Sequence, residues 1–95
     1  MRIIVFTPRI DQKLDAKHDV TPEEVDQCFD NKCGVNLIDD REDHKSDPPS
    51  LWFIAETNKG RLLKIIYVYR DGKYFLKSAF EPGAGDIDTY ENEGK

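Results

Sequence analysis

The sequence has no long hydrophobic run. Its 95 residues are 38% hydrophobic and 35% charged, and no apolar stretch approaches the roughly 20 residues that a helix needs to span a bilayer. Residues 1–7 lack the extended apolar region and the small-residue cleavage site of a signal peptide. These absences predict one small domain with a thin core, no membrane partner and a cytoplasmic location.

An excess of positive charge is also missing. With 14 lysines and arginines against 19 aspartates and glutamates, the formal net charge is -5. Broad adhesion to nucleic acid requires many phosphate neutralisations, so this balance argues against it. It leaves room for a local cationic site, and the residues that could form one are Lys13, Lys17, His18, Arg61, Lys64, Arg70 and Lys77.

Cysteine and histidine are scarce. Cys28 and Cys33 do not have the Cys-x-x-Cys spacing of a zinc knuckle, and His18 and His44 complete no metal-ligand pattern. In a cytosolic chain both cysteines are expected to be reduced thiols, with Cys28 on the buried face of a helix. The acidic residues of 39–47 lack the spaced ligands and the glycine of a calcium loop. Since a phosphate-binding glycine loop and a nucleophile motif are also missing, we predict no cofactor and no metal.

Residues 17–25 carry the clearest local signal, which is a helix start preceded by a cationic pair. Thr21 suits the N-cap, Pro22 suits the first helical position, and Glu24 completes a capping box. The lysine and histidine before this cap then lie just outside the helix, where they can face a ligand or a partner.

The remaining pattern predicts short strands around a hairpin. Residues 61–70 are apolar on both faces, which is typical of a central strand, and Asp71-Gly72 is a two-residue hairpin signal. The predicted strands are 2–6, 35–38, 51–56, 61–70 and 73–80, and the predicted helices are 11–17, 21–30 and a turn at 84–90. This order predicts an α+β fold with an antiparallel β-sheet, a meander, and two N-terminal helices packed on one face. A single domain would span residues 1–90, and residues 91–95 are predicted to be a disordered tail.

The cationic residues suit metal-independent RNA cleavage. Such cleavage requires a base for the 2'-hydroxyl, cations for the charge on the phosphorane and an acid for the leaving oxygen. Lysine, histidine and arginine can fill these roles, and tyrosines can stack on bases. The same residue types equally suit solvated charge at strand edges, and His18 at a helix break can interact with the dipole of the preceding helix.

Three segments share their pattern with a known toxin family. They are Lys13-x-x-x-Lys17-His18-Asp19-Val20-Thr21-x-Glu23-Glu24 followed by Phe29-Asp30, then Gly60-Arg61-Leu62-Leu63 before Ile65-Ile66-Tyr67, and Ser78-Ala79 before Glu81 and Tyr90. Through these segments the chain resembles the BrnT-type toxins of the RelE/ParE-like ribonuclease superfamily.

The resemblance implies a RelE/ParE-like fold and a ribonuclease of a type II toxin-antitoxin system that blocks translation. RNA or the ribosome would be the target, and a small antitoxin would be the protein partner. Lys17, His18 and Arg61 match the family pattern, and Arg70 matches it more loosely. The implied catalytic roles are proton transfer by His18 or Lys17 and phosphate binding by the two arginines.

A departure from the family pattern keeps a second hypothesis open. The family continues its Ser-Ala with arginine and further basic residues, but this chain has Phe80-Glu81-Pro82. A diverged member is therefore expected, and the alternative is a non-catalytic protein–protein interaction module. Trp52 and Tyr74 are the aromatic residues expected to be exposed for this purpose, and the partner would be a small helical peptide or a second copy in a homodimer.

Overall fold

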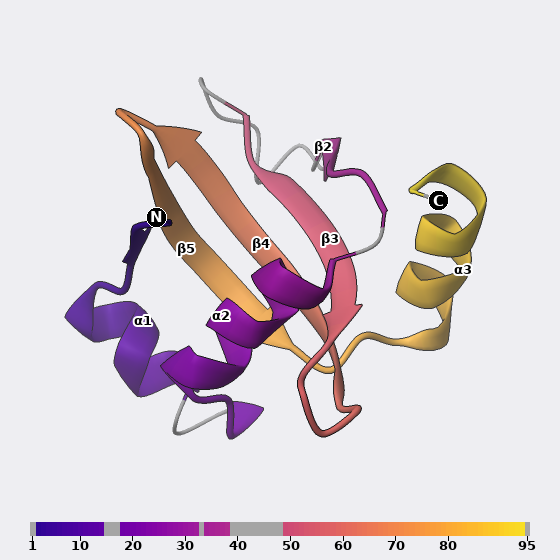
Figure 1. Cartoon of the computed structure of the whole chain (residues 1–95), viewed down its shortest axis with the longest axis horizontal. Coiled ribbons are helices and arrows are strands. Elements are labelled where there is room, and N and C mark those ends of the chain that lie inside the picture. The colour runs from indigo at the N-terminus through magenta and orange to yellow at the C-terminus, as the bar shows by residue number, and fades with distance from the viewer. Residues whose placement is uncertain (1, 15–17, 33, 39–48, 95) are drawn as a thin grey trace.

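The computed structural model describes residues 2–14, 18–32, 34–38 and 49–94 of the chain. It is an α+β domain in which α1 and α2 lie on one face of a five-stranded sheet and α3 lies beside β3 (Figure 1). The elements in chain order are β1 (Ile4–Val5), α1 (Pro8–Lys13), α2 (Pro22–Asn31), β2 (Leu37–Ile38), β3 (Leu51–Glu56), β4 (Leu62–Arg70), β5 (Lys73–Phe80) and α3 (Ala84–Glu93). No helix in these described ranges is long and apolar enough to cross a membrane.

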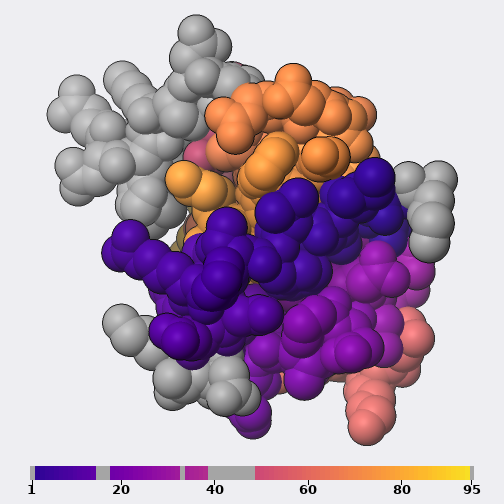
Figure 2. Space-filling view, turned by 90° about the vertical axis from the view of Figure 1, so that its left-hand side faces the viewer, coloured from indigo at the N-terminus to yellow at the C-terminus, as the bar shows by residue number. Residues whose placement is uncertain are grey.

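The sheet is mixed, so the predicted antiparallel meander is wrong at one edge. The strand order is β1-β5-β4-β3-β2. Strands β2 to β5 pair antiparallel, but β1 pairs parallel with β5, with Ile4 opposite Tyr74. A short apolar strand has the same sequence pattern in either direction, and which edge it joins depends on distant segments. Figure 2 shows the result, with α1 and the N-terminal residues in indigo lying between β5 and α2.

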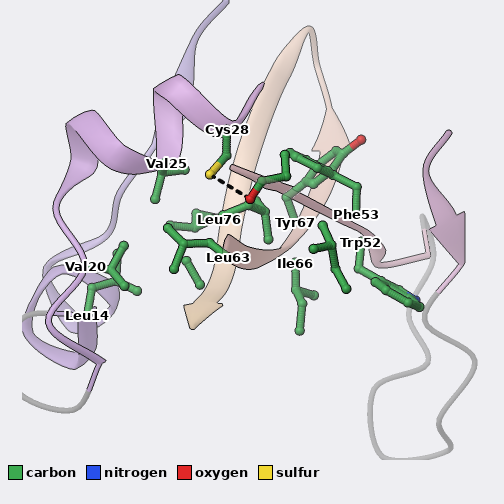
Figure 3. Close-up of a cluster of buried hydrophobic side chains, with 14 of the residues drawn as sticks. Leu14, Val20, Val25, Cys28, Trp52, Phe53, Leu63, Ile66, Tyr67 and Leu76 are labelled. Atoms are coloured by element: carbon green, nitrogen blue, oxygen red, sulfur yellow. Dashed lines mark hydrogen bonds between the residues drawn. The ribbon is translucent and has the colours of Figure 1, made fainter. Parts of the chain in front are cut away.

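One part of the core lies between the sheet and the helices α1 and α2, and another part lies toward α3, where Trp52 and Tyr90 meet. Val25 and Cys28 of α2 are fully buried, and Figure 3 shows them pointing toward the sheet. The half-buried ring of Phe29 meets Phe53 at 4.9 Å between ring centroids, in an edge-to-face arrangement that favours aromatic pairs. Trp52 points away from α2 (Figure 3) and is only 8% exposed, so the prediction that Trp52 is an exposed aromatic is wrong.

Local signals explain where α1 and α2 begin. The capping box of α2 is confirmed, because Glu24 N–H donates to Thr21 Oγ1 at 3.2 Å and Thr21 N–H donates to Glu24 Oε1 at 3.1 Å. The expected helix 11–17 begins earlier than predicted, at Pro8. Thr7 caps it by accepting a hydrogen bond from Ile10 N–H at 3.3 Å, and a proline in the first turn costs no helical bond.

The hairpin and the C-terminal helix complete the domain. Asp71 and Gly72 both have positive φ, at 54° and 75°, which is the two-residue turn that the sequence predicts. The boundary predicted at residue 90 falls inside α3, because this helix continues to Glu93. Tyr90 anchors α3 by donating from its hydroxyl to Val35 O at 2.8 Å, and its ring lies 5.6 Å from that of Trp52.

Gly34 allows the end of α3 to pack closely against the segment before β2. A methyl group at Gly34 would meet Gly94 O and lie 2.6 Å from Tyr90 Oη. We therefore expect Gly34→Ala to lower the free energy of unfolding by about 1 to 2 kcal/mol, in the lower part of the range for overpacking because the C-terminal end can shift. Urea unfolding measures this loss, and Gly85→Ala is the matched control because open space surrounds that glycine. Equal effects of the two substitutions would contradict this description of the α3 contact.

Candidate functional site

Arg61 has its guanidinium surrounded by acceptors from the α1–α2 connection. Its Nη1 donates to Asp19 O at 2.7 Å and lies 3.1 and 3.2 Å from the two carboxylate oxygens of Glu24. Its Nη2 donates to His18 O at 3.0 Å. On the remaining side, Nε lies 3.6 Å from Glu81 Oε2. We call Arg61, Glu24 and the carbonyls of His18 and Asp19 the Arg61 clamp.

The clamp depends on the start of α2. Because Glu24 Oε1 also accepts the Thr21 N–H of the capping box, its carboxylate is held in one orientation toward Arg61. Asp19 has a φ of 50°, which few residues other than glycine adopt and which aspartate tolerates better than most. The arginine thus holds a sharply bent connection against the start of β4.

Charge in the clamp shifts both pKa values in the directions that favour the ion pair. Burial lowers the pKa of Arg61, but the hydrogen bond and charge of Glu24 outweigh this effect and raise it. For Glu24, burial raises the pKa. The hydrogen bonds from Thr21 and Arg61 lower it by more than burial raises it, so the pKa lies below its ordinary value of 4.5. About a quarter of each side chain is exposed, at 26% for Arg61 and 23% for Glu24, so solvent screens the pair only partly.

The lowered pKa of Glu24 predicts a pH-dependent stability. The stabilisation that the charged Glu24 carboxylate gives to the folded state is fully present above the ordinary pKa of 4.5. It is lost as pH falls through the lower pKa of the folded state. We expect Glu24→Gln, which can still form a capping box, to be less stable than wild type by about 1 kcal/mol at pH 7. The difference should shrink in urea unfolding below about pH 4. A difference that stays constant between neutral and acidic pH would show that the charge of Glu24 does not contribute.

Among the predicted site residues that the structure describes, only His18 contacts Arg61, and it does so through its main-chain carbonyl. The centroid of its ring lies 5.6 Å from that of the Phe80 ring, and the two rings are tilted by 39° to each other. It is partly buried and makes further interactions. Lys17, the third residue of this predicted group, lies outside the described residues.

Arg70 lies far from the clamp. It is the last residue of the nine-residue strand β4, and Arg61 directly precedes that strand. At roughly 3.3 Å per residue the two arginines are separated by roughly 25 to 30 Å. Arg70 is 57% exposed at its side chain, lies 4.8 Å from the centre of the Phe75 ring and is 4.0 Å from Asp71. The structure therefore brings His18 and Arg61 together and leaves Arg70 at the other end of the sheet.

Lys64 is also unavailable to a phosphate. It is 6% exposed, its Nζ lies 4.4 Å from the centre of the Trp52 ring, and it forms a 2.9 Å ion pair with Asp86 of α3. A cation over an aromatic face with a carboxylate partner is stabilised where it is. Its place within an otherwise apolar central strand was the sequence signal for this burial.

Cys28 and the metal candidates show no reactive site among the described residues. Cys28 is buried, and burial raises the pKa of its thiol to about 12, so it is not a thiolate at neutral pH. Cys33, His44 and the acidic stretch 39–47 lie outside the described part of the chain. Within the described part, no group of histidine, cysteine and carboxylate residues could hold a metal ion.

A cleft that the sequence did not reveal lies between β3 and α3. Its volume is about 530 Å³, within the range of about 300 to 1,000 Å³ of ligand sites. Aliphatic side chains of Ile54, Leu62 and Ile87 and the ring of Tyr90 line its apolar part. Its polar part is lined by Asn31, Glu56, Thr57, Asn58 and Glu91. We call this the β3–α3 cleft. No sequence pattern indicated it, because its walls come from three segments that are distant in the sequence.

Comparison with protein families, curated proteins and solved structures found no match to this chain.

Proposed function

We propose that the protein is a non-catalytic protein-binding module that uses the β3–α3 cleft. The observation that carries the proposal is that Arg61 is engaged by acceptors of the fold itself. Its donors are directed to two backbone carbonyls and to Glu24, with Glu81 beside its remaining nitrogen. A phosphate at Arg61 would have to compete with these anionic and carbonyl acceptors.

The charge and shape of the surface support the same proposal. The net charge of -5 disfavours the binding of an extended polyanion. The cleft combines an apolar part with asparagine and glutamate side chains, and an apolar surface with a polar rim is typical of protein interfaces.

A toxin-like ribonuclease is the second candidate. The resemblance to BrnT-type toxins favours it, and so does the contact between Arg61 and the main chain of His18, a residue whose side chain is of a type that transfers protons. In that case Arg61 would have to leave Glu24 when RNA binds, and Lys17 would have to supply a further cation.

One experiment separates the two candidates. Purified protein is incubated with translating ribosomes, mRNA cleavage is mapped by primer extension, and growth is followed after overexpression. We expect neither cleavage nor growth arrest. Cleavage by the wild-type protein that is lost in Lys17→Ala and Arg61→Lys, but retained in the control Arg70→Ala, would establish the ribonuclease instead.

A further inference from the structure

One face of β3 and β4 forms the floor of the β3–α3 cleft. Ile54 and Glu56 are two positions apart in β3, so their side chains leave the sheet on the same face. Leu62 is directly opposite Glu56 in the register of β3 and β4 and shares this face. All three residues line the cleft, as does Ile87 of α3. The aliphatic part of the cleft is therefore adjacent to the side chain of Glu56.

Glu56 places a carboxylate at an exposed end of the cleft, and this carboxylate has no cation beside it. The hydrogen bond that Glu56 receives from Asn31 goes to its main-chain oxygen, and no described residue donates to its carboxylate. Lys64 lies diagonally across from Glu56 on the same face, but its ammonium group is paired with Asp86. No lysine or arginine is among the described residues that line the cleft. A cation for Glu56 therefore has to come from a ligand.

The helix α3 holds the other wall of the cleft in place before any ligand binds. Near one end of α3, Asp86 forms its ion pair with Lys64 at 2.9 Å. Near the other end, the hydroxyl of Tyr90 donates to Val35 O at 2.8 Å. The helix is thereby fixed beside β3 (Figure 1). A ligand that enters the cleft does not first have to order one of its walls, which lowers the cost of binding.

An arginine side chain matches this combination of groups. Its aliphatic stem can lie along Ile54, Leu62 and Ile87 while its guanidinium reaches the exposed Glu56, as long cationic side chains do on apolar surfaces. A carboxylate with both oxygens available can accept two parallel hydrogen bonds from one guanidinium. The volume of about 530 Å³ is in the range of sites for drug-sized ligands, so it also has room for apolar neighbours of the arginine. At longer range, the net charge of -5 attracts a cationic segment.

We propose that the partner protein inserts an arginine flanked by aliphatic residues into the β3–α3 cleft, with the guanidinium paired to Glu56. This inference rests on the proposed protein-binding function and names the anchor residue of the partner. The aliphatic residues bury apolar surface against the walls of the cleft, and the ion pair selects arginine among side chains of similar length.

The experiment titrates the full chain, labelled with ¹⁵N, with an acetylated and amidated Ala-Leu-Arg-Leu-Ala peptide as the probe. We expect the amide signals of Ile54, Glu56, Leu62 and Ile87 to shift, and the concentration dependence of the shifts gives the affinity. A second peptide has citrulline, which is neutral and nearly the same shape, in place of arginine. It should bind about fivefold more weakly, because one partly exposed ion pair is lost.

A double-mutant cycle shows whether the arginine meets Glu56 itself. Glu56→Gln should weaken the arginine peptide by the same factor of about five and leave the affinity for the citrulline peptide nearly unchanged, because either change removes the same contact. A merely structural effect of Glu56→Gln would weaken both peptides equally. Glu23→Gln is the matched control, because Glu23 is exposed on α2 and does not line the cleft. It should leave both affinities unchanged.

A small guanidinium compound tests whether a free organic cation is the ligand instead. Butylguanidinium has the stem and head of arginine without the peptide. It should bind about tenfold or more weakly than the arginine peptide, because the flanking aliphatic contacts are missing. Equal or tighter binding of butylguanidinium would assign the cleft to a small organic cation and overturn the proposed anchor.

The remaining outcomes distinguish this inference from the function on which it rests. Shifts in the cleft with equal affinity for the arginine and citrulline peptides would overturn the arginine anchor and leave protein binding at the cleft intact. Shifts confined to other surfaces, or additive effects of Glu56→Gln and citrulline, would overturn it in the same way. Cleavage of mRNA by the wild-type protein would overturn the proposed function itself.

Discussion

Arg61→Ala is expected to destabilise the fold by about 2 to 3 kcal/mol, since the charged hydrogen bonds of a partly buried arginine are lost together. The carbonyls of His18 and Asp19 lose their donor, and Glu24 keeps its charge without a cation beside it. Arg61→Lys should recover only part of this loss, because one ammonium group cannot reach acceptors that a planar guanidinium joins. Chemical denaturation followed by circular dichroism measures the change.

The matched control for this prediction is Arg70→Ala. Arg70 ends the strand that Arg61 precedes, but it is mostly exposed, and the carboxylate of Asp71 lies 4.0 Å away. Its removal should therefore change stability by less than about 0.5 kcal/mol. A double-mutant cycle with Glu24→Gln should then give a coupling energy of about 1 kcal/mol between Arg61 and Glu24. If Arg61→Ala costs no more than Arg70→Ala, the clamp does not hold the α1–α2 connection.

Phe53→Ala is expected to have the largest effect, a loss of about 3 to 5 kcal/mol, as for other large aromatic residues in protein cores. Phe53 is fully buried in β3, and its ring contacts Phe29 at 4.9 Å and Tyr67 at 6.2 Å between centroids. Since small domains have only about 5 to 15 kcal/mol of stability, this loss would leave much of the protein unfolded at 37 °C.

Tyr69→Ala tests whether burial or aromatic character causes that loss. Tyr69 is on the neighbouring strand and is 49% exposed, although its ring also contacts another aromatic at 4.9 Å. We expect it to cost less than about 1 kcal/mol. Because Phe53 fixes β3, and Ile54 and Glu56 of that strand line the cleft, Phe53→Ala should also weaken binding of a protein partner at the cleft wherever it still folds. Equal losses in the two variants would contradict the location of the core.

Local interactions are the part of the fold that could be predicted from sequence. The Thr21 capping box depends on residues three positions apart, and the Asp71-Gly72 turn depends on backbone preferences of adjacent residues. The strands 51–56 and 73–80 have the predicted limits for the same reason. The parallel pairing of β1 depends on a segment about 70 residues away, and no local pattern encodes it.

The candidate site was harder to predict because a charged residue has the same appearance in sequence whether it binds a ligand or another side chain. Arg61 matched a toxin pattern, but its partner Glu24 also belonged to the capping box, and nothing in sequence indicated that the two would meet. The β3–α3 cleft was missed for a related reason. Its helical wall lies in a region predicted as a single turn and tail, whereas the bond from Tyr90 to Val35 fixes a complete helix there.

Site-specific photocrosslinking tests the central claim, that this protein binds a protein partner through the β3–α3 cleft, most directly. A photoreactive phenylalanine is introduced in place of Glu56 in the cleft, or of Lys73 on the exposed start of β5 as control, and expressed in the native cell. We predict a discrete protein adduct from position 56, resistant to ribonuclease, and none from position 73. An adduct with RNA, or the same adducts from both positions, would contradict the account.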